Sequence, residues 1–108
     1  MQKFTLYLGL NDRQTKAQKI TTDKAVQLIN QTIGDCTISS CMGTYTDLSG
    51  KTTLENTLKI ELLDFNKNID IDFIIQKLGI LFNQESIAFE QQKINTSIVV
   101  VIYGNNGY

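Results

Sequence analysis

Apolar and polar side chains alternate through residues 36–65, and this pattern predicts one long β-hairpin. Successive side chains of a strand point to opposite faces of a sheet, so one parity faces a core and the other faces water. Here the even positions carry the apolar side chains, and we expect them to face the core. They are Ile38, Met42, Leu54, Leu58, Ile60 and Leu62.

The turn of this hairpin predicts the same register as the alternation. Residues 48–50 offer a three-residue loop in which Gly50 takes the positive φ of a bulged turn. Centring the loop on Ser49 places Cys41 opposite Thr57, and even positions then meet even positions throughout.

The flanking segments predict two further strands and two helices. Residues 4–10 alternate as a half-buried strand, and residues 86–90 as another, with Ile87 and Phe89 inward. A first helix starts after Thr21 or Thr22 and ends at Gly34, with apolar residues on one stripe. A second starts after Asn68 or Asp70 and runs to about residue 82. Gly79 lies inside it, and we expect a close approach of this helix to the sheet there.

The order strand, helix, strand, strand, helix, strand predicts an α+β sandwich of the ferredoxin-like type, formed by residues 1–108 as a single domain. We expect an antiparallel sheet with the first strand between the third and the last, and both helices on one face. Residues 98–102 are apolar without alternation, and the segment 97–103 predicts an appended C-terminal strand or a continuation of the preceding one.

Composition excludes several classes of function. The formal net charge is −1 and Arg13 is the only arginine, which argues against a nucleic-acid partner. Without histidine there is no serine-histidine or cysteine-histidine nucleophile, and we expect no metal site and no cofactor. Cys36 and Cys41 have opposite parity on one strand and are expected to stay reduced. We find no leader and no membrane segment, and so expect a cytoplasmic protein.

Several short motifs together resemble a known family. They are the Tyr7-Leu-Gly9 end of the first strand, Gly43-x-Tyr45 before Gly50, Leu54-Glu55-Asn56-Thr57, and residues 82–87 after the second helix. They look like those of the small bacterial domains of unknown function numbered 3574. The resemblance implies a ferredoxin-like fold and no catalytic residues. Short chains of this style also look like accessory proteins of phages.

Four side chains are the candidate ligand-binding residues. Tyr7, Tyr45 and Glu55 share the predicted open sheet face, and Glu85 lies in the loop after the second helix. Tyrosines offer stacking area with a polar tip, and carboxylates bind amine or ribose groups. The competing interpretations are a solvated face for Glu55, near Lys59, and helix termination with strand entry for the Glu85 loop.

Two functions are compatible with this pattern. The first is a non-catalytic binding domain, a phage accessory protein that counters host defence by holding a host protein or a small polar, nucleotide-like ligand. The second is a small enzyme in which Glu55 or Glu85 acts as the acid or base. The apolar run of residues 98–102 predicts a homodimer or higher homo-oligomer, because a small domain cannot bury both sides of such a strand.

Overall fold

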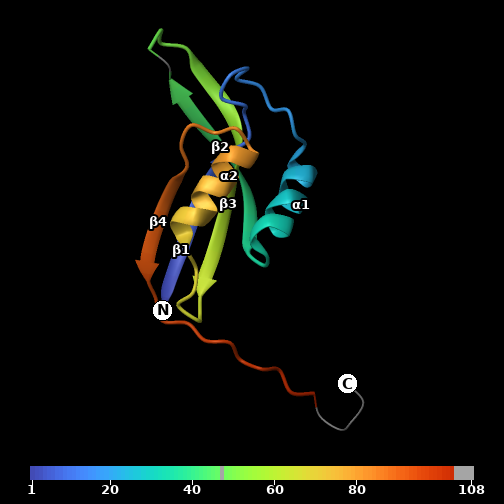
Figure 1. Cartoon of the computed structure of the whole chain (residues 1–108), viewed down its shortest axis with the longest axis vertical. Coiled ribbons are helices and arrows are strands. Elements are labelled where there is room, and N and C mark those ends of the chain that lie inside the picture. The colour runs from blue at the N-terminus through green and yellow to red at the C-terminus, as the bar shows by residue number, and fades with distance from the viewer. Residues whose placement is uncertain (47, 104–108) are drawn as a thin grey trace.

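The computed structural model describes residues 1–46 and 48–103, and of Tyr45 only the backbone. The chain runs through β1 (Gln2–Gly9), α1 (Thr22–Ile33), β2 (Thr37–Thr46), β3 (Thr52–Asp64), α2 (Ile71–Leu81) and β4 (Ala88–Lys93). The strands form one antiparallel sheet in the order β2-β3-β1-β4, and both helices cover one of its faces (Figure 1). The predicted α+β fold of the ferredoxin-like type, with β1 between β3 and the last strand, is therefore confirmed.

The register of the β2-β3 hairpin is also as predicted. Cys41 pairs with Thr57 and Gly43 with Glu55, so even positions meet even positions along the whole ladder. Gly50 has φ +85°, the positive value that its place in the turn requires. Asp47, where the sequence predicts that the turn begins, lies outside the described residues.

The core lies between the sheet and the two helices. Leucines of β1, aliphatic residues of β3 and the inner stripes of α1 and α2 meet there, as their periodicity predicts. Its buried members are Leu6, Leu8, Leu10, Ala25, Ile29, Leu58, Ile60, Leu78 and Phe82.

Both helices begin at capping residues that the sequence identifies. The Thr21 hydroxyl accepts a hydrogen bond from the Lys24 amide at 3.2 Å, and the Asp70 carboxylate accepts one from the Phe73 amide at 3.1 Å. Helix α1 ends at Gly34, whose φ of +81° allows its amide to bond the Asn30 carbonyl at 2.9 Å. These caps fix where each helix starts over the sheet.

The assignment of the whole even face of the hairpin to the core is wrong near its tip. Leu58 and Ile60 are buried, but Met42 is 60% exposed and Leu54 is 65% exposed. The hairpin extends past the two helices (Figure 1), so neither helix covers the helix-side face of its outer part. The alternation of the sequence shows which face a side chain points to, but it does not show whether a helix covers that face at the tip of the hairpin.

The C-terminal region differs more from the prediction. The last strand begins at Ala88 rather than residue 86 and continues to Lys93, and Phe89 is 44% exposed although it points to the helix side. The appended C-terminal strand is absent from this single chain, because residues 94–103 have no strand beside them to pair with. They run away from the body as an extended segment (Figure 1).

Three smaller expectations have separate outcomes. A Cβ added at Gly79 would meet the Gln84 carbonyl oxygen at 3.9 Å and Ile87 at 4.0 Å, so the helix is close to its own following loop and not to the sheet, contrary to the prediction. Cys36 precedes β2 and Cys41 lies within it, and the two are not bonded to each other. No helix in the described part of the chain is long and apolar enough to cross a membrane.

Candidate functional site

Two loops meet at the end of the sheet where β1 finishes. The first loop, residues 10–20, follows β1, and the second, residues 82–87, joins α2 to β4. Each starts with a buried core residue, Leu10 and Phe82, which anchors it to the core. The polar residues that follow are thereby held against one another at this end of the sheet.

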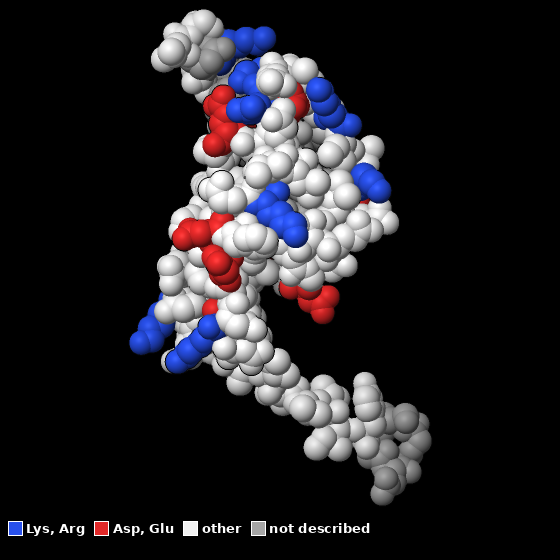
Figure 2. All heavy atoms as spheres, in the orientation of Figure 1, with Lys and Arg blue, Asp and Glu red and all other residues white. Residues whose placement is uncertain are grey.

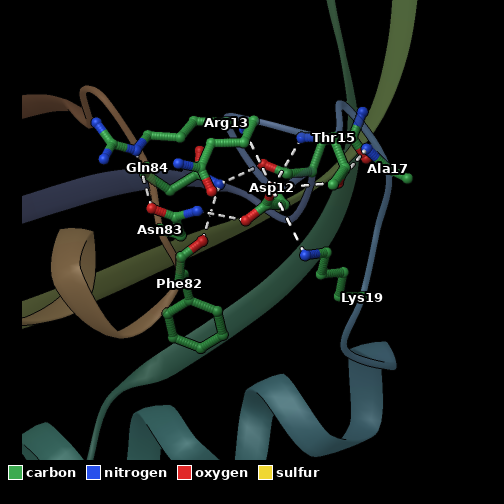
Figure 3. Close-up of polar contacts among 10 residues, drawn as sticks. Asp12, Arg13, Thr15, Ala17, Lys19, Phe82, Asn83 and Gln84 are labelled. Atoms are coloured by element: carbon green, nitrogen blue, oxygen red, sulfur yellow. Dashed lines mark hydrogen bonds and ion pairs between the residues drawn. The ribbon is translucent and has the colours of Figure 1, made fainter.

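Asp12 organises the first loop and ties it to the second. Its Oδ1 accepts hydrogen bonds from the amides of Gln14 and Thr15, at 3.1 and 2.9 Å, and from the Thr15 hydroxyl at 3.1 Å (Figure 3). Its Oδ2 accepts another from the Asn83 side-chain amide. The Thr15 amide first, and then Asn83, hold the pKa of the Asp12 carboxyl well below its usual range, because every donor favours the charged form. Asp12 is therefore a structural carboxylate with its acceptors occupied.

Asn83 bridges the loops through its backbone as well. The Arg13 amide donates to the Asn83 carbonyl at 3.1 Å, and the Arg13 Nε donates to Asn83 Oδ1 at 2.9 Å (Figure 3). The Gln84 side chain adds a bond to the Asn11 carbonyl at 2.6 Å. Asn83 has φ +50°, a left-handed conformation that asparagine tolerates better than most residues.

Glu55 reaches this cluster from the neighbouring strand β3. Its Oε2 accepts a hydrogen bond from the Asn11 amide at 2.9 Å, and its carboxylate lies directly over Gly9. A Cβ built on Gly9 would stand 2.4 Å from the Glu55 carboxylate, so a residue with a side chain at position 9 would displace it. The glycine thus opens the place in which this half-buried carboxylate sits.

An open pocket of about 290 Å³ lies between Glu55 and the two loops. A second pocket of about 510 Å³ adjoins it along the outer side of α2, and the two share Arg13 and residues 84–86. The smaller pocket is lined by Asn11, Asp12, Arg13, Lys16, Glu55, Gln84, Glu85 and Ser86. Together they offer room for a ligand of ordinary cofactor size.

The predicted site residues are brought together only in part. Glu55 and Glu85, far apart in sequence, line the same pocket. Tyr7 lies on the same sheet face, but its hydroxyl donates to Glu90 of β4 at 2.5 Å rather than pointing to the pocket. This bond is the first cause of a raised pKa for Tyr7, since the carboxylate stabilises the protonated phenol. Tyr45 has its backbone in β2, and its side chain lies outside the described residues.

The sequence analysis selected Glu85 in the second loop, but it did not predict the contact between the two loops. In the first loop it noted Arg13 only as the single arginine of the chain. Nothing in the sequence shows that Asn83 bonds both Asp12 and Arg13, because 71 positions separate Asn83 from Asp12. Lys16, with φ +62°, was not recognised as a lining residue at all.

The charges of the smaller pocket are mixed. Glu55 and Glu85 supply two carboxylates, while Arg13 and Lys16 supply two cations. Figure 2 likewise shows acidic and basic groups interspersed over the viewed surface rather than gathered by sign. In the described residues no three cysteine or acidic side chains gather to hold a metal ion. The pocket therefore suits a ligand that itself carries charges of both signs.

Two solved structures share this fold. One is a phage SAM lyase in complex with S-methyl-5'-thioadenosine, which is 24% identical over 85% of this chain and 80% of its own, with a TM-score of 0.64. The other is a phage SAM lyase in the apo state, 24% identical over 95% of this chain and 92% of its own, with a TM-score of 0.61. No family model and no curated protein sequence matches the chain.

Proposed function

We propose that this chain is a phage anti-defence enzyme that binds S-adenosylmethionine and breaks it down with release of S-methyl-5'-thioadenosine. The observation that carries the proposal is the charge pattern of the pocket. S-adenosylmethionine has two cations, the sulfonium and the amino group, and one carboxylate. Glu55 and Glu85 match the cations, and Arg13 matches the carboxylate.

The likeness in fold to two phage SAM lyases supports the same ligand class. It favours the enzymatic alternative of the sequence analysis over the non-catalytic binding domain. The likeness to the apo structure covers 95% of this chain and 92% of that one, so it extends over nearly the whole of both. The two adjoining pockets, of about 290 and 510 Å³, give room for the amino-acid and nucleoside halves of the ligand.

The chemistry is compatible with a chain that has no histidine. When a carbon–sulfur bond of a sulfonium breaks, the electron pair moves onto sulfur, and the departing group is a neutral thioether. Such a leaving group needs no proton, so a general acid is not required at that atom. The remaining tasks are to bind and orient the substrate, and in this proposal Glu55 holds one of its cationic groups.

The direct test is to incubate the protein with S-adenosylmethionine and to measure S-methyl-5'-thioadenosine by mass spectrometry. The mass of the other product identifies attack by water, which adds one water molecule to that product. Attack by the substrate's own carboxylate gives a lactone and loss of a proton from carbon gives an unsaturated amino acid, and these isomers of equal mass are distinguished by NMR. Glu55→Gln and Glu85→Gln should each lower kcat/KM by about 10- to 100-fold, the cost of losing one hydrogen bond to a charged group.

Glu61→Gln is the matched control. Glu61 is a carboxylate on the same sheet face, paired with Lys3 at 2.9 Å and outside both pockets, so its activity should stay within about twofold of wild type. Binding of S-adenosylmethionine without any product would restore the non-catalytic binding function. Absence of both binding and product would overturn the proposal.

The other sequence-based expectations about this function remain part of the proposal. Tyr45 is proposed to stack on the nucleoside from β2, and Tyr45→Ala should then raise KM more than it lowers kcat. We also propose that the protein works in the cytoplasm of the infected cell, where S-adenosylmethionine is made, and that it self-associates.

A further inference from the structure

Residues 94–103 form what we term the C-terminal arm, in which residues 98–102 are apolar and largely exposed. The side chains of residues 98–103 are between 70% and 87% exposed. The arm carries no charged residue, and in Figure 2 it is white along its described length. Five consecutive exposed β-branched residues, 98–102, are typical of a strand that lacks its partner.

The sheet has one edge that lacks the usual protection against such a strand. Edge strands normally carry charges, prolines or bulges that prevent pairing with other chains. Strand β2 is ten residues long and contains neither a charged residue nor a proline. The other edge, β4, is six residues long and carries Glu90 and Lys93. We propose that the C-terminal arm of one copy adds as a strand to the β2 edge of a second copy.

The arm cannot reach the β2 edge of its own chain. It starts from β4, and a place beside β2 lies four strand spacings away, roughly 19 Å at about 4.8 Å each. The four residues 94–97 span at most roughly 14 Å, and they would also have to reverse the chain. The Ile94 amide instead donates to the Met1 carbonyl at 3.0 Å, which carries the arm past the start of β1 and away from the body (Figure 1).

The β2 edge also offers apolar surface for the arm to cover. Met42 points to the helix side of β2 and is 60% exposed. An added strand places every second side chain on that same side of the sheet. Valines of the arm would then bury Met42, while the backbone groups of both strands gain hydrogen-bond partners.

Such a contact is heterologous, since arm and edge are different surfaces of the chain. It closes either by reciprocal exchange between two copies or as a ring of more copies. The solution mass is therefore expected at a small multiple of 12.2 kDa.

The cysteines of the chain allow a direct test in the full-length protein. Cys41 is exposed on β2, and replacing Cys36 by serine leaves it as the only thiol. Val99, Val100 and Val101 are then changed to cysteine one at a time, and the protein is oxidised and run on a non-reducing gel. A disulfide needs Cβ atoms about 3.5–4.5 Å apart, so neighbouring strand positions should differ sharply.

We expect the yield of disulfide-linked product for Val100→Cys to differ by about tenfold or more from the yields for both Val99→Cys and Val101→Cys. The disulfide should map to Cys41 of another copy. Adding Cys41→Ser should abolish the product. Equal cross-linking at all three positions, or its survival without Cys41, would overturn the proposal. Cross-linking to a cysteine placed at Glu90, in the Cys41→Ser background, would identify β4 as the edge and would equally refute β2.

A charge in the arm provides the second measurement. Val100→Lys should give a soluble protein of 12.2 kDa by sedimentation, with an unchanged circular dichroism spectrum, while wild type is larger. A wild-type protein that sediments as a monomer at micromolar concentration contradicts the proposal. Its failure would leave the proposed cleavage of S-adenosylmethionine untouched, because that is tested by product formation and by pocket variants.

Discussion

The two faces of β1 have opposite roles. Phe4, Leu6 and Leu8 point to the helices and are buried among other apolar side chains. Tyr7 and Gly9 point to the open face, where one bonds Glu90 and the other leaves space for the Glu55 carboxylate. The same eight-residue strand thus supplies the centre of the core and one wall of the candidate site. Changes at the even positions of β1 should therefore affect mainly stability, and changes at the odd positions should affect mainly the candidate site.

Leu8→Asp should produce the largest effect of any single change on β1. Leu8 is fully buried, and the variant loses its packing and places a carboxylate in an apolar core, a cost of more than about 4 kcal/mol. The protein should be unfolded at 25 °C by circular dichroism. As a control, Val100→Asp, in the exposed arm, should keep the native spectrum. A folded Leu8→Asp variant would show that the helix-side face is not the core.

Gly9→Ala should affect the site more than the fold. The new Cβ would overlap the Glu55 carboxylate, which must move and lose its bond to the Asn11 amide. We expect a stability loss of about 1–3 kcal/mol, since overpacking of this kind has that cost. Product formation from S-adenosylmethionine should fall by at least about tenfold.

The matched control for this change is Gly43→Ala. A Cβ at Gly43 would stand 2.8 Å from the Thr57 hydroxyl, a comparable overlap on the same sheet face but outside the pocket residues. It should lower stability to a similar extent and leave activity per folded molecule unchanged. Equal loss of activity in both variants would mean that the Glu55 position is not specific to the site.

Most of the fold was predictable, because its determinants are local. Parity, the turn at Gly50 and the caps at Thr21 and Asp70 each depend on a few neighbouring residues, and they define strands, register and helix starts. Predictions failed where a distant layer decides the outcome. Met42 has the parity of a core residue, yet no helix extends over it.

The candidate site was less predictable than the fold for the same reason. Glu55 and Glu85 were selected by residue type and predicted face, and they do line one pocket. The contact of Asn83 with both Asp12 and Arg13 requires the two loops to be placed first. The C-terminal arm shows the same limit. Its continuous apolar residues predict burial, but they do not indicate which surface buries them. The resemblance to the 3574 family stays a prediction.

Gly79→Ala should change stability less than Gly9→Ala does, and it should raise stability rather than lower it. Gly79 lies inside α2, and an added Cβ would make only ordinary contacts with Gln84 and Ile87. Replacing glycine by alanine within a helix stabilises it by about 1 kcal/mol, which for this size raises Tm by about 4 °C. A calorimetric scan measures this directly. A lowered Tm would indicate that the loop after α2 is packed more tightly than the structure shows.

The smallest expected effect concerns the pH dependence of the open face. Because the Tyr7 hydroxyl donates to Glu90, the pKa of Tyr7 is raised above its ordinary value of 10.0. The folded protein therefore holds this proton more tightly than the unfolded chain. The resulting stabilisation is complete below about pH 10 and is lost as the pH rises through the folded-state pKa, since the unfolded state then releases its proton more readily.

Spectrophotometric titration near 295 nm should show this directly as a difference between wild type and Tyr7→Phe. The difference should contain one tyrosine that ionises at higher pH than the remaining ones, and Glu90→Gln should bring it back toward its ordinary pKa. Tyr7→Phe should change stability only slightly at neutral pH, because the pair is exposed, and should flatten the loss of Tm above pH 10. A Tyr7 that ionises at or below its ordinary pKa would contradict the bond to Glu90. The Tyr7 hydroxyl would then be available to a ligand in the site, and the open face of β1 would contribute a reactive group as well as a wall.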